Sequence, residues 1–279
     1  MMLCPYNTRA VVALSGADAG QVLQGLITND IALLNQHPLL YTAWLSAQGR
    51  YQFDFFLFKK DSVYYALVET ARVADFTKLL KLYKLRNQMT IQDMSAEFLV
   101  YVDLAAKSHS DAFFQAKDPR HPDLGSIIVM PKNTALEATA NPSEHQNQRY
   151  QLGLAEGSEE LKLQKSVILE YHFDAMNALS WTKGCYMGQE LMARTKHRGG
   201  IHKEAMGFKL ANPTETLGTD IFCKDTKVGS LLCHTQSHGL ALIRHEHKDL
   251  LQTHQFKARD DLGNTLQLIP SPLSTFFNS

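Results

Sequence analysis

The chain has few of the features that mark secreted, membrane-spanning or nucleic-acid-coating proteins. Its 279 residues include only four cysteines, and no two of them form a CxxC pair. Neither a disulfide framework nor a paired zinc motif is therefore indicated. No apolar run approaches the ~20 residues that a membrane-spanning helix needs, and the first residues form no apolar stretch of signal length. We expect a cytoplasmic protein that makes no membrane contact.

An excess of charge of one sign is also lacking. Lysine and arginine together number 28, aspartate and glutamate together number 28, and the pI is near 7.2. The whole chain therefore has no strongly basic footprint for nucleic acid. One basic run extends from Arg194 to Lys203, with no acid before Glu204. It is typical of either a phosphate-contacting segment or a solvated helix face. Neutral total charge favours the second, so we expect no direct RNA contact.

Four histidines lie close to Cys233 in the sequence, at positions 234, 238, 245 and 247. Their spacing matches no recognised zinc motif, and polar residues on strand surfaces explain them better. Hydrophobic residues make up 44% of the chain, so a large core can form without a metal. We therefore expect no resident metal at these histidines.

Hydrophobic patterning changes near residue 200. Before it, alternating and helical periodicities predict an α+β arrangement. The predicted strands are 10–14, 39–45, 53–57, 63–67, 89–93, 97–104 and 125–131, and the predicted helices are 19–27, 71–85 and 187–198. Ser15 and Asp18 form a capping-box pattern before the first helix, and 132–148 is predicted to be a surface connection. After residue 200, short strands alternate with turns and no helix is predicted, which is typical of a small β-barrel.

The most informative segment is the octapeptide Lys183–Glu190, KGCYMGQE. It places Cys185 between two glycines, shortly before a predicted helix. A nearby cation such as Lys183, and the positive end of a helix, both favour the thiolate form of a cysteine. A role for Cys185 as nucleophile, redox sensor or iron ligand therefore stands beside the alternative of a small buried hydrophobe.

The other residues of the octapeptide have their own candidate roles. Glycines allow a backbone or a ligand to approach closely. The polar pair at the end of the octapeptide would either bind a partner or cap the helix start. The remaining candidate residues of the motif are Gly184, Tyr186, Gly188, Gln189 and Glu190.

The octapeptide resembles the KGC-[FY]-x-GQE signature of the YgfZ family of folate-binding proteins, which is related to the T-protein (aminomethyltransferase) of glycine cleavage. Helix or core packing alone would require few of its residues, so chance is a poor explanation. The resemblance covers most of the chain, in matching order and spacing. Its further segments are Leu23–Asp30 (LQGLITND), Ser46–Arg50 (SAQGR), Tyr83–Arg86 (YKLR), Asp118–Arg120 (DPR) with Leu124–Gly125, Arg149–Gly157 (RYQLGLAEG) and Lys227–Ser230 (KVGS).

The resemblance implies a T-protein-like fold, in which two α+β lobes and a C-terminal antiparallel β-barrel surround an opening that holds folate. Residues 1–200 are then expected to form the folate-binding region. Within it, about 1–45 with 150–200 would form one lobe and 46–149 the other. Residues 201–279 are expected to form the barrel, and the protein is expected to be a monomer.

A site for tetrahydrofolate, or for a one-carbon derivative of it, also follows from the resemblance. Such a site needs a flat apolar slot, a polar anchor for the pteridine and cations for the glutamate tail, and arginine suits carboxylates because its fork is bidentate. Aromatic residues at 41, 44, 51 and 53 would line the slot or pack in the core. The candidate cations are Arg9, Arg50, Arg86 and Arg149, and the candidate anchors are Asn29, Asp30 and Glu156.

The function implied by the resemblance is support of iron–sulfur cluster assembly or repair in client enzymes, which include radical enzymes that thiolate tRNA. Folate would be a ligand, the partners would be client enzymes or assembly factors, and Cys185 and Lys183 would form the working site. One cysteine cannot hold a cluster alone, so Cys185 would be a transient ligand of iron. Two alternatives remain open. The related fold favours an aminomethyltransferase that passes a one-carbon unit to tetrahydrofolate, and the basic run favours an RNA-binding scaffold.

Overall fold

Two compact units make up the computed structural model, which describes residues 2–274. The first unit contains Met1–His145 and Asp174–Gln189, and the second contains Gln146–Phe173 and Glu190–Ser279. The chain therefore leaves the first unit and returns to it for the segment that carries most of the octapeptide. Residues 150–173 are grouped with the second unit, whereas the resemblance places them with the first lobe. The lobe boundaries themselves stay a prediction.

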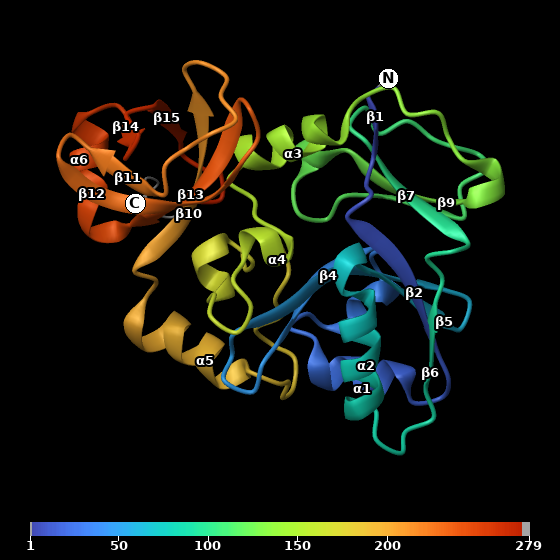
Figure 1. Cartoon of the computed structure of the whole chain (residues 1–279). Helices are drawn as coiled ribbons and strands as arrows, with labels where there is room; N and C mark the ends of the chain where they lie inside the picture. The colour runs from blue at the N-terminus through green and yellow to red at the C-terminus, as the bar shows by residue number, and fades with distance from the viewer. Residues whose placement is uncertain (1, 275–279) are drawn as a thin grey trace. The chain divides into compact units, whose positions relative to one another are not determined.

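The first unit contains a five-stranded antiparallel sheet with the order β3-β4-β5-β2-β6 (Figure 1). Its strands are β2 (Arg9–Ser15), β3 (Leu40–Leu45), β4 (Tyr51–Lys60), β5 (Val63–Glu69) and β6 (Thr90–Asp93). Strand β4, which pairs with β3 and β5, is buried without interruption from Phe53 to Phe58. Such continuous burial is expected of a strand that is covered on both faces.

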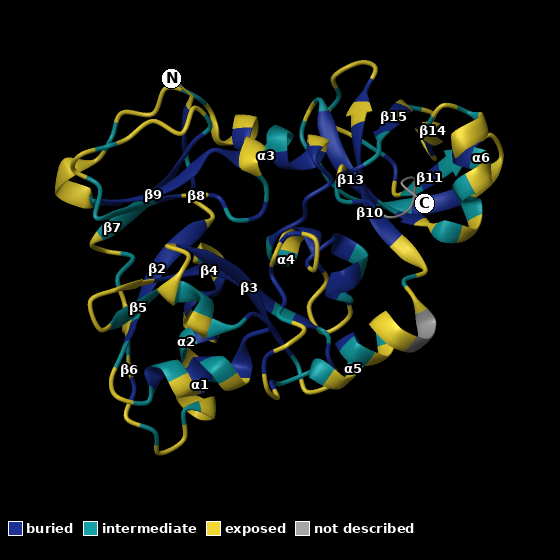
Figure 2. Cartoon of the chain, turned by 180° about the vertical axis from the view of Figure 1, so that it is seen from behind, coloured by how far each residue is buried: buried dark blue, intermediate teal, exposed yellow. Residues whose placement is uncertain are grey.

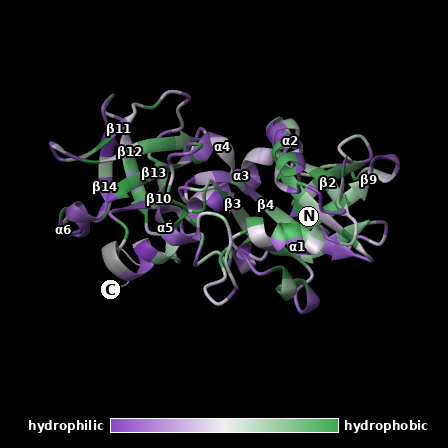
Figure 3. Cartoon of the chain, turned by 90° about the horizontal axis from the view of Figure 1, so that it is seen from below, coloured by the Kyte–Doolittle hydropathy of each residue, from purple (hydrophilic) through white to green (hydrophobic). Residues whose placement is uncertain are grey.

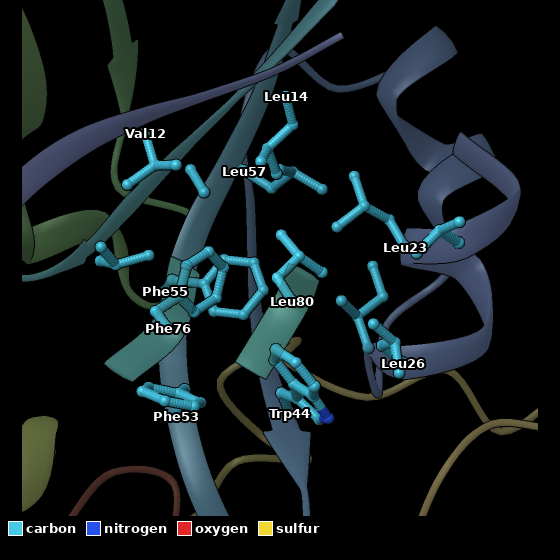
Figure 4. Packing of buried hydrophobic residues seen from close by; sticks show 14 of the residues in the cluster. Val12, Leu14, Leu23, Leu26, Trp44, Phe53, Phe55, Leu57, Phe76 and Leu80 are labelled. Atoms are coloured by element: carbon cyan, nitrogen blue, oxygen red, sulfur yellow. The ribbon is translucent and has the colours of Figure 1, made fainter. Parts of the chain in front are cut away.

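Two helices, α1 (Ala19–Leu26) and α2 (Val73–Tyr83), lie on one face of this sheet (Figure 1). Each has apolar residues at helical spacing and therefore turns one hydrophobic side toward the strands. Figure 4 shows the resulting core, where Phe76 meets Trp44 and Phe53 edge to face with ring centroids 5.9 and 5.3 Å apart. This geometry suits the quadrupoles of aromatic rings and adds to the gain from burial.

A second antiparallel sheet in the first unit has the order β1-β7-β9-β8. Its strands are β1 (Leu3–Pro5), β7 (Phe98–Asp103), β8 (Phe114–Lys117) and β9 (Ser126–Pro131). Strand β8 was not predicted, because its four residues show no clear alternation. A tertiary contact holds it, since Phe114 stacks on Phe58 with ring centroids 3.8 Å apart. Figure 2 shows the strands of both sheets largely buried and their connections exposed.

The second unit contains a closed six-stranded barrel, as the sequence predicts. Strand β10 pairs with both β13 and β15, so the barrel has no free edge. Its strands are β10 (Lys203–Leu210), β11 (Asp220–Cys223), β12 (Thr226–His234), β13 (His238–Arg244), β14 (Lys257–Asp260) and β15 (Thr265–Ile269). Strand β13 is largely hydrophobic, whereas helix α6 (Lys248–Thr253) is largely hydrophilic (Figure 3).

Several short helices complete the chain. They are α4 (Gly157–Glu160), α5 (Gln189–Arg194) with a π-helical turn at Thr195–Gly199, and 3-10 turns at Ile31–Asn35, Thr70–Arg72, Pro122–Leu124, Lys132–Thr134, Ile168–Tyr171 and His245–His247. Helix α3 (Pro142–Gln151) occupies part of the predicted surface connection, and α6 interrupts the predicted all-β region. Both predictions were wrong, because a polar helix such as α3 carries no apolar stripe and α6 is too short to show one.

The predicted capping box at the start of α1 is also wrong. The Asp18 side chain makes no cap hydrogen bond to the helix. Instead, its Oδ2 accepts a hydrogen bond from the backbone nitrogen of Gln88 at 2.7 Å. The carboxylate thus ties the helix start to the segment that enters β6, a contact between residues 70 positions apart in sequence.

Gly207 on β10 gives a direct test of barrel packing. A Cβ added there would lie 1.9 Å from the carbonyl oxygen of Tyr150, whereas one added at Gly25 in α1 would meet nothing within 4 Å. Gly207→Ala should lower the free energy of unfolding by about 2 kcal/mol or more, because backbone must move. Gly25→Ala should be neutral or stabilising by up to about 1 kcal/mol. Urea denaturation measures both effects as shifts of the unfolding midpoint, provided that the denaturant slope m is the same in the variants and the wild type. Equal midpoints for the two variants would contradict the packing described.

Candidate functional site

Three segments that resemble family motifs meet in the first unit. The backbone nitrogen of Ser180 donates to the carbonyl of Thr28 at 3.0 Å, and that of Met187 donates to the carbonyl of Gly25 at 3.0 Å. The Thr28 hydroxyl donates to the carbonyl of Ala178 at 2.7 Å. The segment Ala178–Gln189, called the signature loop below, is therefore hydrogen-bonded to the end of α1 and to the residues that follow it.

Lys183 lies beneath the signature loop, with only 8% of its surface exposed. Its Nζ donates to the carbonyl oxygens of Gln24, Ile27 and Asn29 at 2.7, 2.9 and 2.8 Å. An ammonium has three protons, so every donor is used. The carbonyls of Gln24 and Ile27 lie at the C-terminal end of α1, where the last carbonyls of a helix have no partner within it and carry partial negative charge. That of Asn29 lies in the bend that follows. Lys183 therefore caps the C-terminal end of α1 and has no proton left to donate to Cys185.

Gly188 lets the signature loop pass close to the turn between β3 and β4. Its φ is +82°, and a Cβ there would lie 2.7 Å from the carbonyl oxygen of Ser46 and 2.9 Å from Cα of Gly49. Only glycine fits a left-handed conformation at so close an approach. This contact brings the predicted SAQGR turn against the octapeptide.

Cys185 is exposed at the surface of the signature loop. Its neighbour Tyr186 is buried, and the Nζ of Lys183 lies 5.1 Å from the centre of the Tyr186 ring. Burial raises the pKa of Tyr186 to about 12. The alternative of a buried hydrophobic cysteine is therefore excluded for Cys185 by its exposure, while the residues beside it are fixed.

The predicted helix start lies farther from Cys185 than the sequence suggested. Helix α5 begins at Gln189 rather than at 187. Glu190 is 86% exposed at its side chain and pairs with Arg194 at 2.8 Å, so it lies on the solvent side in the first turn. Two features were expected to favour a thiolate at Cys185. The helix terminus begins four residues after Cys185, and the Lys183 ammonium donates its hydrogen bonds to backbone carbonyls.

The residues predicted to anchor pteridine are largely engaged in internal contacts. The Asn29 amide donates to the carbonyls of Tyr41 and Asn177 at 2.9 and 2.7 Å, and its oxygen accepts from the nitrogen of Asp30 at 2.9 Å. The Asp30 carboxylate accepts from the Gln24 amide at 3.0 Å and caps the 3-10 turn that follows. Both side chains thus shape the bend that receives the signature loop.

Arg9 is buried and binds a buried carboxylate rather than facing solvent. Its Nη1 donates to the carbonyl of Asp54 at 2.8 Å, and its Nη2 pairs with the Asp54 carboxylate. Tyr41 and Tyr51 donate their hydroxyls to the same carboxylate at 2.8 and 2.6 Å. Burial and the Asp54 charge raise the pKa of Tyr51 well above its usual value. Sequence analysis did not single out Asp54, because a polar residue within the strand segment FDFF is expected to point toward solvent.

Arg149, in the second unit, is also committed to internal partners. Its Nη1 and Nη2 bind the Glu160 carboxylate at 2.9 and 2.8 Å, and Nη1 also donates to the carbonyl of Leu154 at 3.0 Å. The Glu156 carboxylate lies 3.5 Å from Nε. Although burial alone would lower the pKa of Arg149, Glu156 and Glu160 raise it well above its usual value. Arg149 and Glu156 therefore form a structural ion cluster and do not fit a folate-binding role.

Of the remaining predicted cations, Arg50 lies half-buried at the turn beside Gly49, and Arg86 is exposed. The DPR segment forms another buried pair, in which the Arg120 side chain binds the Asp118 carboxylate at 2.7 Å. Among residues 2–274, no group of three or more histidine, cysteine or acidic side chains is placed to hold a metal ion. Within the same residues, no helix has the length and apolar character needed to span a membrane.

Comparison with known proteins identifies relatives but no matching family model. An iron–sulfur cluster assembly factor IBA57 homolog, mitochondrial, from Pyricularia oryzae is 31% identical over 223 residues, which are 72% of this chain and 55% of the relative. A protein of the same name from Neurospora crassa is 28% identical, over 73% of this chain and 52% of the relative. The mouse iron–sulfur cluster assembly factor IBA57, mitochondrial, is 28% identical, over 85% and 76%. The chain spans about half the length of the two fungal relatives.

A solved structure shows the fold. The glycine cleavage system aminomethyltransferase T from Bartonella henselae matches with a TM-score of 0.74, over 98% of this chain and 86% of that chain, at 12% identity. The predicted T-protein-like fold is therefore confirmed, and at this identity the likeness says nothing about activity. The expected cytoplasmic location is contradicted, because the three sequence relatives are all named as mitochondrial.

Lys183→Met should destabilise the first unit, because methionine has no donor for three carbonyls at the end of α1. Unsatisfied buried polar groups cost about 1–3 kcal/mol each, so a loss of about 3 kcal/mol is expected in the free energy of unfolding. Lys209→Met, at an exposed site on β10, is the matched control.

The burial of Lys183 should also make the free energy of unfolding depend on pH. Burial lowers the pKa of Lys183 from 10.5 to about 8, although Asp30 opposes the shift. Between these values the unfolded chain holds more protons, so the free energy of unfolding should rise with pH relative to Lys183→Met. A difference that is flat or falls between pH 8 and 10 would contradict this assignment.

Proposed function

We propose that this chain is an assembly factor for iron–sulfur clusters, the activity for which its sequence relatives are named. The observation that carries the proposal is the signature loop. Two other motifs of the first unit, LQGLITND and SAQGR, contact this loop, and Cys185 lies exposed on its surface. An exposed thiol adds nothing to the packing of the core, so its place on a segment held by several hydrogen bonds favours a role in binding.

The proposed chemistry is that of a single iron ligand. Thiolates are soft ligands that suit iron–sulfur clusters, and Cys185 supplies one of them. The cluster is cargo, and the other ligands come from the assembly factor or client enzyme that gives or receives it. Lys183 and Gly188 hold the loop on either side of the thiol, so that it meets the partner in one fixed geometry. They act as positioning residues.

The client class follows from the resemblance. Radical enzymes that thiolate tRNA carry iron–sulfur clusters, so loss of this protein would affect tRNA indirectly, through its clients. The basic run adds little support for direct RNA contact, because Arg194 pairs with Glu190.

Folate binding is the second part of the proposal, and it is supported by the fold. Arg9, Asn29, Arg149 and Glu156 are engaged in buried contacts, so they are not proposed as ligands. Arg50 and Arg86 are the cations proposed for the glutamate tail. No chemical step is assigned to folate.

The resemblance to T-proteins also supplies a second candidate function, an aminomethyltransferase. The two functions differ in their need for Cys185, because one-carbon transfer to folate requires no thiol on this chain. Formation of methylenetetrahydrofolate from an aminomethylated carrier protein would favour the transferase.

The Cys185 role is tested in a strain that lacks its own relative of this chain and that loses activity of an iron–sulfur enzyme as a result. Wild type should restore the activity of that enzyme. Cys185→Ser should restore little of it, because a hydroxyl is a poor cluster ligand at neutral pH. Both Cys185→Ser and the control Thr182→Ala, at another exposed site of the signature loop, should keep wild-type thermal stability. Full rescue by Cys185→Ser would exclude Cys185 as the working thiol.

Folate binding is tested by calorimetry with tetrahydrofolate on the whole chain. Wild type should bind at a single site, and Arg50→Ala should weaken the affinity by about tenfold, as expected for loss of a bidentate carboxylate contact. Lys59→Ala, an exposed cation at the end of β4, should leave the affinity unchanged. Absence of binding to wild type would remove folate from the proposal, while the Cys185 result would stand on its own.

A further inference from the structure

A hollow of about 300 Å³ opens on the second unit, where the π-helical turn leads into the barrel. Its lining comes from two short stretches, at the start of β10 and at the end of β13. The lining residues are His202, Lys203, Arg244, His245 and Glu246. Four of these five side chains are cations or can become cations, in a chain whose net charge is zero.

The basic residues of this hollow lie opposite one another on two neighbouring strands. Lys203 and Arg244 are directly paired in the β10–β13 ladder. The next residues outward are joined by a hydrogen bond from the nitrogen of His245 to the carbonyl of His202 at 2.9 Å. Like charges directly opposite each other destabilise a pair of strands. The Lys203–Arg244 pair therefore lowers the stability of the strand pairing, and a bound anion would offset that repulsion.

A buried carboxylate contacts one of the side chains that line the hollow. Glu204 is 1% exposed, and its Oε2 lies 3.3 Å from Nε2 of His245. Its other oxygen lies 3.2 Å from Nδ1 of His172, whose Nε2 donates to the carbonyl of Ala205 at 2.8 Å. The carboxylate orients the His245 ring in the way that an acid partner orients a functional histidine.

We propose that this hollow is a binding site for a phosphate-sized oxyanion, such as a phosphate monoester. Lys203 and Arg244 supply the permanent charge, and Arg244 offers a planar fork that matches tetrahedral oxyanions. His202 and His245 complete the lining. Glu246, which pairs with Arg244 at 3.3 Å, occupies the arginine while no anion is bound. Nothing in the proposed cluster chemistry of Cys185 requires this site.

Binding should be linked to protonation of His245. Burial lowers the pKa of His245, the charges of His202 and Lys248 lower it further, and Glu204 opposes them. The other charged groups at the hollow are Lys203, Arg244, Glu246 with its neighbour His247, and His172 across Glu204. A bound dianion favours the imidazolium form of His245. Anion affinity should therefore increase as pH falls.

The test is a titration of the whole chain with inorganic phosphate at constant ionic strength, followed by backbone amide NMR. Saturable shifts should appear at residues 202–204 and 244–246. Arg244→Gln should weaken the affinity by about tenfold. Glu246→Gln should strengthen it severalfold, because it frees the arginine, and misfolding cannot produce a gain. Lys209→Gln, an exposed lysine on the same strand, is the control for general charge and should change nothing.

Three outcomes would overturn the site. They are no saturable shift with phosphate, a loss in Lys209→Gln equal to that in Arg244→Gln, and unchanged or weaker binding in Glu246→Gln. A short single-stranded RNA that binds while phosphate does not would also overturn it, in favour of a polynucleotide surface. Because phosphate itself titrates near neutral pH, the pH series uses sulfate, and an affinity that does not rise from about pH 8 to about pH 6 would exclude the role of His245.

Discussion

A buried ammonium at the C-terminal end of α1 is the interaction on which the rest of the candidate site depends. Lys183 can be buried only because the carbonyls of Gln24, Ile27 and Asn29 receive its three protons. The carbonyls of Gln24 and Ile27, at the end of α1, in turn have no partner within the helix and need a donor. The LQGLITND and KGCYMGQE segments are therefore two halves of one contact, although more than 150 residues separate them in sequence.

This contact divides the octapeptide into residues that fix the loop to the rest of the first unit and one residue, Cys185, that is exposed to solvent. Lys183, Tyr186 and Gly188 face inward, where substitution would disturb hydrogen bonds, packing or a left-handed backbone. Cys185 faces solvent between them. Fixing both ends of a short loop limits the conformations open to its middle, so the thiol is positioned without being enclosed. That arrangement suits transfer between proteins better than chemistry in a closed pocket.

Buried ion pairs engage two of the arginines that the sequence indicated as ligand-binding residues. Arg9 binds Asp54, and Arg149 binds Glu160. A buried guanidinium is stable only with an acidic or carbonyl partner, and in both cases that partner was not recognisable from local sequence. Asp54 lies within an apolar strand, and Glu160 lies in a four-residue helix. Neither environment carries a periodic signal that would indicate a paired carboxylate.

The sequence by itself determined the elements with strong periodicity, namely most of the sheet strands, α1, α2 and the barrel, because hydrophobic spacing follows directly from strand and helix geometry. It also indicated the octapeptide and the other family-like segments as candidates for the site. Tertiary structure alone decided which charged residues face inward, that Lys183 caps a helix instead of assisting Cys185, and that β8 forms against Phe58. It also placed Lys203 opposite Arg244. The physical reason is that burial and charge pairing depend on residues far apart in the chain, and a single sequence records the residues without recording which of them meet.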